Sequence, residues 1–141
     1  MAYCDLDDLK ARVDEEELIS LTDDDDAGDI DTEKTDAAIA AADALINAYC
    51  SRRYNVPFDP VPEIVTTLSV DIAVYKLFSR RGRAGDNTRN DYNDAVRFLK
   101  DVAEKRANID GVVEEPAEKA SHPVTITQSG RIFSRTKMDG F

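Results

Sequence analysis

Three prolines within six residues, Pro57, Pro60 and Pro62, set the first limit on how this chain can fold. Proline has no backbone N–H and forces the residue before it into an extended conformation, so no helix can run through this segment. The stretches on both sides are rich in alanine and in other apolar residues. We therefore expect a rigid, well-packed elbow over 56–62 that joins two long helices.

The stretch after the elbow, Pro62–Ser79, is predicted to be the central helix of the domain. Pro62 suits the first turn of a helix, and the carboxylate of Glu63 interacts favourably with the helix dipole there. Apolar side chains occur around nearly the whole circumference of this helix: Ile64, Val65, Leu68, Val70, Ile72, Ala73, Val74, Tyr75, Leu77 and Phe78. A helix of this kind is either the most buried one or faces another subunit.

Four more helices are predicted from apolar residues that recur at helical spacing. They are expected over Asp5–Val13, Glu15–Leu21, about Thr35–Tyr54 and about Asn87–Ala107. Asp14 and Thr35 are residue types that favour the N-cap position. The sequence thus predicts an all-α fold, a compact bundle of three main helices with one or two short N-terminal helices, occupying residues 1–109.

Residues 110–141 have a different character and are predicted to form a linker and a C-terminal docking arm. Gly111–Lys119 is acidic and contains proline, whereas 124–127 and 131–134 alternate as β-strands do. An isolated two-stranded hairpin is marginally stable in water. The extended arm is therefore expected either to form a hairpin against its own domain or to add a strand to another chain.

The charge of the chain is unevenly distributed. Residues 1–36 carry fifteen acidic and three basic side chains, and the remaining 105 residues carry fourteen acidic and fifteen basic ones. This acidic head disfavours a general DNA-binding role, because neutralising phosphates requires a basic face. The chain shows no apolar run that could cross a bilayer and no signal-peptide pattern, so we expect a protein that stays in the cytoplasm where it is made.

The sequence offers few residues for catalysis, and we expect no enzyme. His122 is the single histidine and precedes a proline, so it makes a poor partner for a nucleophile. Cys4 and Cys50 are too few for a metal cluster and are expected to be small apolar residues, buried or half-buried. Gly82 and Gly85 belong to a turn and do not match a phosphate-binding loop.

Asp71 is the best single candidate for acid–base chemistry, because it lies within the apolar central helix. A carboxylate buried among apolar residues can acquire an unusual pKa. The preferred interpretation is structural: an ion pair or hydrogen bond between helices, with an arginine such as Arg53 or Arg97 as the partner.

An aspartate-rich loop over Asp23–Asp31 invites comparison with a calcium-binding loop. With Gly28 at the sixth position, aspartates fall at the first and third positions, but Ala27 falls at the fifth and Lys34 at the twelfth, where calcium needs oxygen ligands. The weak metal candidates are Asp23, Asp25, Asp29 and Asp31. We expect no specific metal site, and an acidic, calcium-responsive helical binding module stays the alternative function.

A basic turn, Arg80–Arg83, follows the central helix. It could contact nucleic acid or an acidic surface, or lie in solvent at the favourable C-terminal end of a helix dipole. In an oligomer, the acidic head of an adjacent copy would be a natural partner.

The last eleven residues combine basic and large apolar side chains, the types that dominate binding hot spots. Such a composition is atypical of a segment that is only solvated. The predicted partner-binding residues are Arg131, Ile132, Phe133, Arg135, Met138 and Phe141.

Taken in order, these features resemble the Mu-like bacteriophage head–tail adaptor family, also called neck or connector proteins. The likeness covers nearly all of the chain, although no single motif is diagnostic. The matching stretches are Met1–Tyr3 with Leu6–Leu9, Glu15–Ile19, Asp29–Asp31, the helix ending in Ser51–Tyr54, the elbow with Pro57 and Pro60–Pro62, Asp71–Tyr75, Arg131–Arg135 and Gly140–Phe141.

The resemblance implies a structural virion protein that joins the capsid to the tail. Such a subunit would form a ring of twelve copies beneath the portal protein and present a surface to a tail or stopper protein. Its C-terminal arm would reach into the portal, and genome DNA would pass through the channel without sequence-specific binding. The protein would be located in the neck of the virion, with no membrane association.

Overall fold

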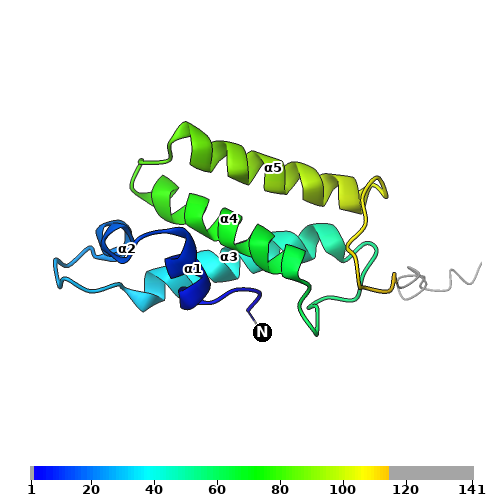
Figure 1. The fold of residues 1–141 in the computed structure, drawn as a ribbon, viewed down its shortest axis with the longest axis horizontal. Coiled ribbons are helices and arrows are strands. Elements are labelled where there is room, and N and C mark those ends of the chain that lie inside the picture. The colour runs from blue at the N-terminus through cyan, green and yellow to red at the C-terminus, as the bar shows by residue number, and fades with distance from the viewer. Residues whose placement is uncertain (1, 115–141) are drawn as a thin grey trace, which may run out of the picture.

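The computed structural model describes residues 2–114 and contains five helices. They are α1 (Leu6–Arg12), α2 (Glu15–Thr22), α3 (Thr32–Cys50), α4 (Glu63–Arg80) and α5 (Asp86–Ala103) (Figure 1). The predicted all-α fold, with three main helices and two short N-terminal ones, is confirmed. The expected strands over 124–127 and 131–134 and the arm that contains them lie outside the described residues.

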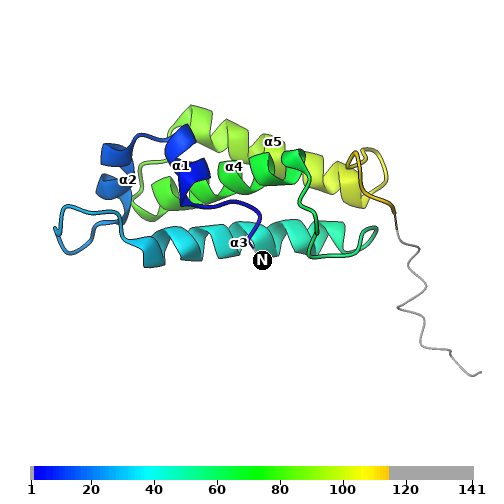
Figure 2. The ribbon, with the colours of Figure 1, turned by 60° about the horizontal axis from the view of Figure 1, so that its bottom comes forward.

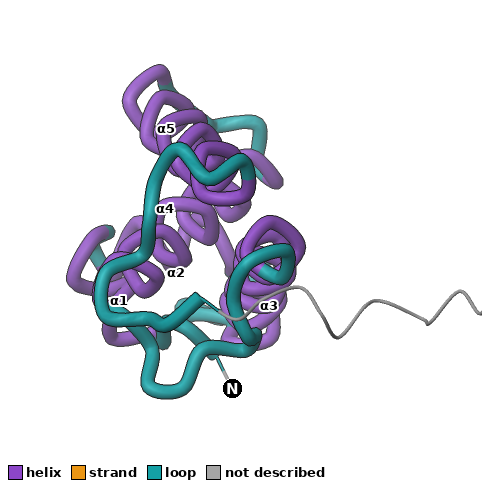
Figure 3. The backbone as a smooth tube through the Cα atoms, turned by 90° about the vertical axis from the view of Figure 1, so that its right-hand side faces the viewer, coloured by secondary structure: helices purple, strands orange, loops and turns teal. Residues whose placement is uncertain are grey.

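Helix α4 lies at the centre of the bundle and packs against each of the other four helices. The view along the bundle shows α4 between α5 and α3, with α1 and α2 on a third side (Figure 3). Its buried residues are Val65, Leu68, Ser69, Val70, Ile72, Ala73, Val74 and Leu77. The apolar character of Pro62–Ser79 is thus explained by burial within a single chain.

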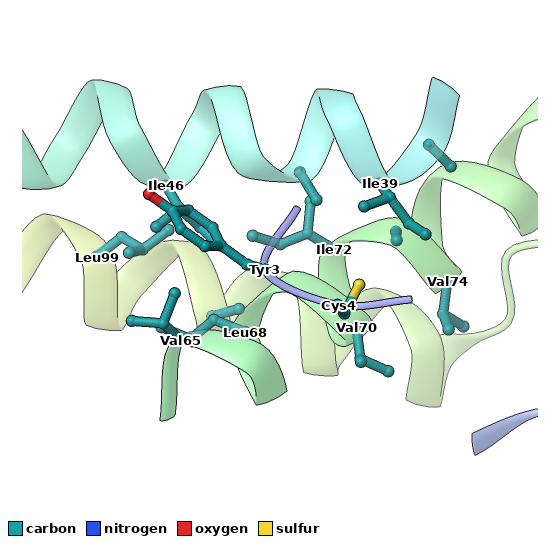
Figure 4. Close-up of a cluster of buried hydrophobic side chains, with 14 of the residues drawn as sticks. Tyr3, Cys4, Ile39, Ile46, Val65, Leu68, Val70, Ile72, Val74 and Leu99 are labelled. Atoms are coloured by element: carbon teal, nitrogen blue, oxygen red, sulfur yellow. The ribbon is translucent and has the colours of Figure 1, made fainter. Parts of the chain in front are cut away.

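The core is a continuous layer of apolar side chains between the three long helices. Ile39 and Ile46 of α3 face Leu68 and Ile72 of α4, and Leu99 extends the same layer from α5 (Figure 4). Burying an aliphatic side chain of this size contributes about 1.5–3 kcal/mol each. Apolar burial is therefore the main force holding the helices together.

The extended N-terminal segment inserts into this core. The backbone N–H of Tyr3 donates to Asp43 Oδ2 over 3.1 Å, and the Tyr3 hydroxyl donates to Asn47 Oδ1 and accepts from the N–H of Phe58 at 3.2 Å. Asp43 Oδ1 also accepts from the hydroxyl of Ser69 on α4 at 2.9 Å. These bonds hold the start of the chain, α3, the elbow and α4 in one arrangement.

Both cysteines are free and buried, as predicted. Cys4 Sγ lies 3.2 Å from Ser69 Oγ, and Cys50 closes the last turn of α3. Burial raises the pKa of each thiol to about 11. At neutral pH both are therefore protonated, poorly nucleophilic packing residues.

The start of α3 was predicted incorrectly. The helix begins at Thr32, and its N-cap is Asp31, whose side chain accepts from the N–H of Glu33 at 3.0 Å. Thr35, the expected cap, is fully buried and donates its hydroxyl to the carbonyl of Thr32 at 3.0 Å. Asp14 does precede α2, but its side chain makes no capping hydrogen bond.

Helices α3 and α5 each end four residues earlier than predicted, at Cys50 and Ala103. Beyond α5, Lys105 adopts a left-handed backbone conformation, with φ of 65°, which a helix cannot contain. Beyond α3, Arg53 and Tyr54 turn inward and make contacts that a continued helix would not allow.

Arg53 ties these two helix ends together. Its side chain is 5% exposed, and its Nη1 donates to the carbonyls of Val102 and Ala107, both at 2.7 Å. Nη2 donates to Asn108 Oδ1 at 2.8 Å, and Nε donates to Glu114 Oε1 at 3.1 Å. Arg53 therefore caps the C-terminal end of α5 and binds the last described residue of the chain.

We expect Arg53→Met to lower the free energy of unfolding by about 3 kcal/mol, because the change leaves buried carbonyl oxygens without a donor. Arg52→Met is the matched control, since Arg52 is the exposed neighbour, and it should change stability by less than about 0.5 kcal/mol. Urea denaturation followed by circular dichroism measures both. Equal effects of the two substitutions would contradict the role given to Arg53.

Candidate partner-binding surfaces

The six predicted partner-binding residues lie outside the described residues, and so does His122. The structure does describe the base from which residues 115–141 continue. Glu114 is held by Arg53, and the hydroxyl of Tyr54 accepts from the N–H of Ile109 at 3.1 Å. The point at which the chain leaves the domain is thus fixed by two consecutive residues after α3. Sequence reasoning missed this anchor, although the Arg53–Tyr54 pair directly before the elbow was a visible signal.

The acidic head of the chain contacts its own basic turn. The carboxylate of Asp24 lies 2.6 Å from both Arg80 and Arg81, and Glu17 lies 2.6 Å from Arg83. Arg80 also donates to the carbonyl of Leu21 at 2.6 Å. Helix α2 packs beside α4, so the arginines at the C-terminal end of α4 and in the following turn meet carboxylates of the same chain. The expected pairing with an adjacent copy stays a prediction.

The aspartate loop uses its carboxylates to order its own backbone. Asp23 accepts from the N–H groups of Ala27 and Gly28 at 2.9 and 2.7 Å, and these bonds lower the pKa of Asp23. Asp31 caps α3, while Asp25 and Asp29 are exposed. Among residues 2–114, no three histidine, cysteine, aspartate or glutamate side chains come together as a metal-binding group. Asp23 and Asp31 therefore stabilise the loop and the start of α3.

Asp24 should make the stability of the head depend on pH. The hydrogen bond from Arg80 holds the pKa of Asp24 below its ordinary value of 3.8. A lowered folded-state pKa adds stability above the ordinary value, and this contribution is lost as the pH falls through the folded value. We expect Asp24→Asn to lower the urea midpoint at pH 7. The midpoints measured at pH 7 and at about pH 3 should therefore differ less in this variant than in the unmodified protein.

Asp25→Asn is the control, because Asp25 is an exposed neighbour in the same loop. The expected result is no change in either midpoint. If the two variants behave alike, the contact between Asp24 and the arginines contributes nothing to stability.

Asp71 faces a cleft of about 330 Å³ between the short helices and α4–α5. Its partner is Arg12, whose Nη2 lies 3.3 Å from Asp71 Oδ1 and 2.8 Å from Asp91 Oδ2. The predicted partners were wrong: Arg53 caps α5 at another place, and Arg97 lies near Asp94 on its own helix. No sequence signal singled out Arg12, which lies 59 positions before Asp71.

The surroundings of Asp71 only partly compensate its negative charge. Its Oδ1 atom is buried and makes no aligned hydrogen bond, although Arg12 lies within ion-pair distance. Burial raises the pKa of Asp71, Arg12 opposes this shift, and Asp91 adds to it. Among residues 2–114, no histidine, serine or cysteine lines the cleft beside Asp71; its lining also includes Val74, Phe78 and Thr88. Its geometry supports an ion pair between helices, as the sequence interpretation preferred.

The raised pKa of Asp71 predicts the opposite pH behaviour to that of Asp24. A folded-state pKa above the ordinary 3.8 means that stability is lost as the pH rises through the folded value. Asp71→Asn should therefore maintain or raise the urea midpoint at pH 7. The control is Asp94→Asn at an exposed position, which should leave the midpoint unchanged. A clear loss of stability in Asp71→Asn would mean that attraction to Arg12 outweighs the cost of burial.

No helix within residues 2–114 is long and apolar enough to cross a membrane. Comparison with known proteins then places this helical domain in a class of bacteriophage proteins. The family model described as "Bacteriophage Mu, Gp36" matches residues 3–128 of the chain. The chain belongs to the bacteriophage Mu Gp36 family.

A relative in Haemophilus influenzae, the Mu-like prophage FluMu protein gp36, is 28% identical over 115 residues. This similarity covers 82% of the present chain and 80% of that protein. The Mu-like origin expected from the sequence is thus confirmed. The matched region also includes nearly all of the described helical domain.

Proposed function

We propose that this protein is a head–tail adaptor of a Mu-like phage or prophage particle and has a structural role, not an enzymatic one. Its subunits form a ring of twelve copies beneath the portal protein and join the capsid to a tail or stopper protein. Membership of the Mu Gp36 family supports this assignment. The protein is made in the host cytoplasm and resides in the neck of the virion.

The observation that carries the proposal is the buried anchor at the base of the arm. Arg53 binds Glu114 and two carbonyls near the end of α5, so the segment after Glu114 starts from a fixed position on a rigid domain. The chain then continues to residues 131–135, in which two large apolar residues lie between two arginines. A rigid body with such a segment suits a subunit that docks on a larger assembly.

The surface charge agrees with a conduit for DNA. The excess of carboxylates is concentrated in residues 1–36, and the strongly basic turn Arg80–Arg83 is engaged by Asp24 and Glu17. Paired arginines are less available to phosphates, and acidic surfaces repel them. The genome would pass through a ring of these subunits without sequence-specific binding.

The proposal predicts that the protein forms a ring on its genome's portal protein, visible by negative-stain microscopy. Deleting 131–141 should leave the helical content unchanged but abolish the ring. The double substitution Ile132→Ser/Phe133→Ser should have the same effect, because it removes the apolar anchors. Val124→Ser/Ile126→Ser is the matched control within the same arm and should leave the ring intact.

Two outcomes would contradict the proposal at different levels. A ring that persists without 131–141 would contradict the docking role of the arm but not the adaptor role. Failure of the folded, intact protein to bind the portal protein under any condition would overturn the adaptor role itself.

A further inference from the structure

A groove of about 530 Å³ runs between α3 and the N-terminal segment. In Figure 2 this segment lies alongside the middle of α3. Six apolar residues contribute to the groove: Ala2, Cys4, Leu6, Ile39, Ala40 and Ala44. Because Ala40 and Ala44 are small and exposed, the floor of the groove lies close to the backbone of α3. The groove therefore has room for large apolar side chains.

In the part of the chain that the structure describes, the charged residues of the groove are all acidic. Asp5, Asp36 and Asp43 line it, and no lysine or arginine within residues 2–114 does. Asp43 is held in place by Tyr3 and Ser69, so its charge is fixed at this position. An apolar floor with acidic edges is complementary to a peptide that carries apolar anchors between basic residues.

The chain contains a segment with this chemistry, residues 131–141. Ile132 and Phe133 lie between Arg131 and Arg135, and Met138 and Phe141 follow. The segment contains three basic residues and one acidic residue. The segment complements both the apolar floor and the acidic edges of the groove.

The segment is also close enough to reach the groove of its own chain. The described part ends at Glu114, which is bound to Arg53, and Arg53 follows the groove residue Asn47 by six positions. Arg131 follows Glu114 by seventeen positions, a length of chain that can span up to about 55 Å, whereas α3 is about 28 Å long. A tether of this length gives an effective concentration in the millimolar range, which favours binding within one chain over binding between chains.

We propose that the groove between α3 and the N-terminal segment holds residues 131–141 of the same chain before the protein meets a partner. In this state the apolar anchors are covered, so they do not form an exposed apolar surface that binds other molecules nonspecifically. This inference concerns the free protein and does not depend on the proposed adaptor role. A partner that binds the segment more strongly than the groove would release it.

The test is photo-crosslinking in the full-length chain with a benzophenone amino acid in place of Phe133. On irradiation at micromolar concentration, the crosslink should form within one chain and map by mass spectrometry to residues 36–47 or 2–6. Ala44→Lys should reduce this product at least about five-fold, because it fills the groove and repels the arginines. Lysine has nearly the helix propensity of alanine, so circular dichroism should be unchanged.

Ala48→Lys is the matched control, since Ala48 is exposed one turn further along α3 and does not line the groove. It should leave the crosslink unchanged. Raising the salt concentration should weaken the crosslink, since opposite charges contribute to it.

Three results would overturn the proposal. A crosslinked band at twice the chain mass would show that a second copy supplies the segment. Crosslinks scattered over the surface would show that the groove has no preference for it. Equal yields from Ala44→Lys and Ala48→Lys would show that the contact lies elsewhere. None of these results bears on portal binding, so failure here and failure of the adaptor role are distinguishable.

Discussion

The architecture depends on the need to cover α4 on all sides. A helix that is apolar around most of its circumference cannot be shielded from water by one neighbour. Helices α3 and α5 cover two sides, and the short helices α1 and α2 cover a third. This explains why a chain of modest length retains two helices of 7 and 8 residues, which would not be stable alone. They form because α4 provides a surface against which to pack.

Apolar burial does not by itself select one arrangement, and a few polar side chains supply that selection. Asp43 joins the N-terminal segment to α4, and Arg53 joins the end of α3 to the end of α5. Arg12 joins α1 to Asp71 of α4 and to Asp91 of α5. Each of these residues contacts at least two separate elements. A shift of one helix along another would break several hydrogen bonds at once, whereas apolar side chains tolerate small shifts more easily.

The sequence was sufficient to predict the helices and their order, because these follow from local periodicity and from proline. For α4 it left two alternatives, burial at the centre of the domain or contact with another subunit. It was insufficient for the polar contacts, because their partners lie far apart in the chain. Arg12 and Asp71 are 59 positions apart, and Arg53 and Glu114 are 61 apart. Several arginines were equivalent candidates for Asp71 on local grounds. The start of α3 was missed for a related reason: Thr35 and Asp31 are both good caps, and only the burial of Thr35 in the tertiary structure decides between them.

The buried contacts of Arg53 also determine how the domain would bear a mechanical load. A force that pulls on the chain beyond Glu114 would first reach an arginine that is attached to the ends of two helices. The tension would be shared between α3 and α5 and pass into the core, instead of unwinding α5 one turn at a time from its free end. A subunit built in this way resists unwinding of α5 from its C-terminal end.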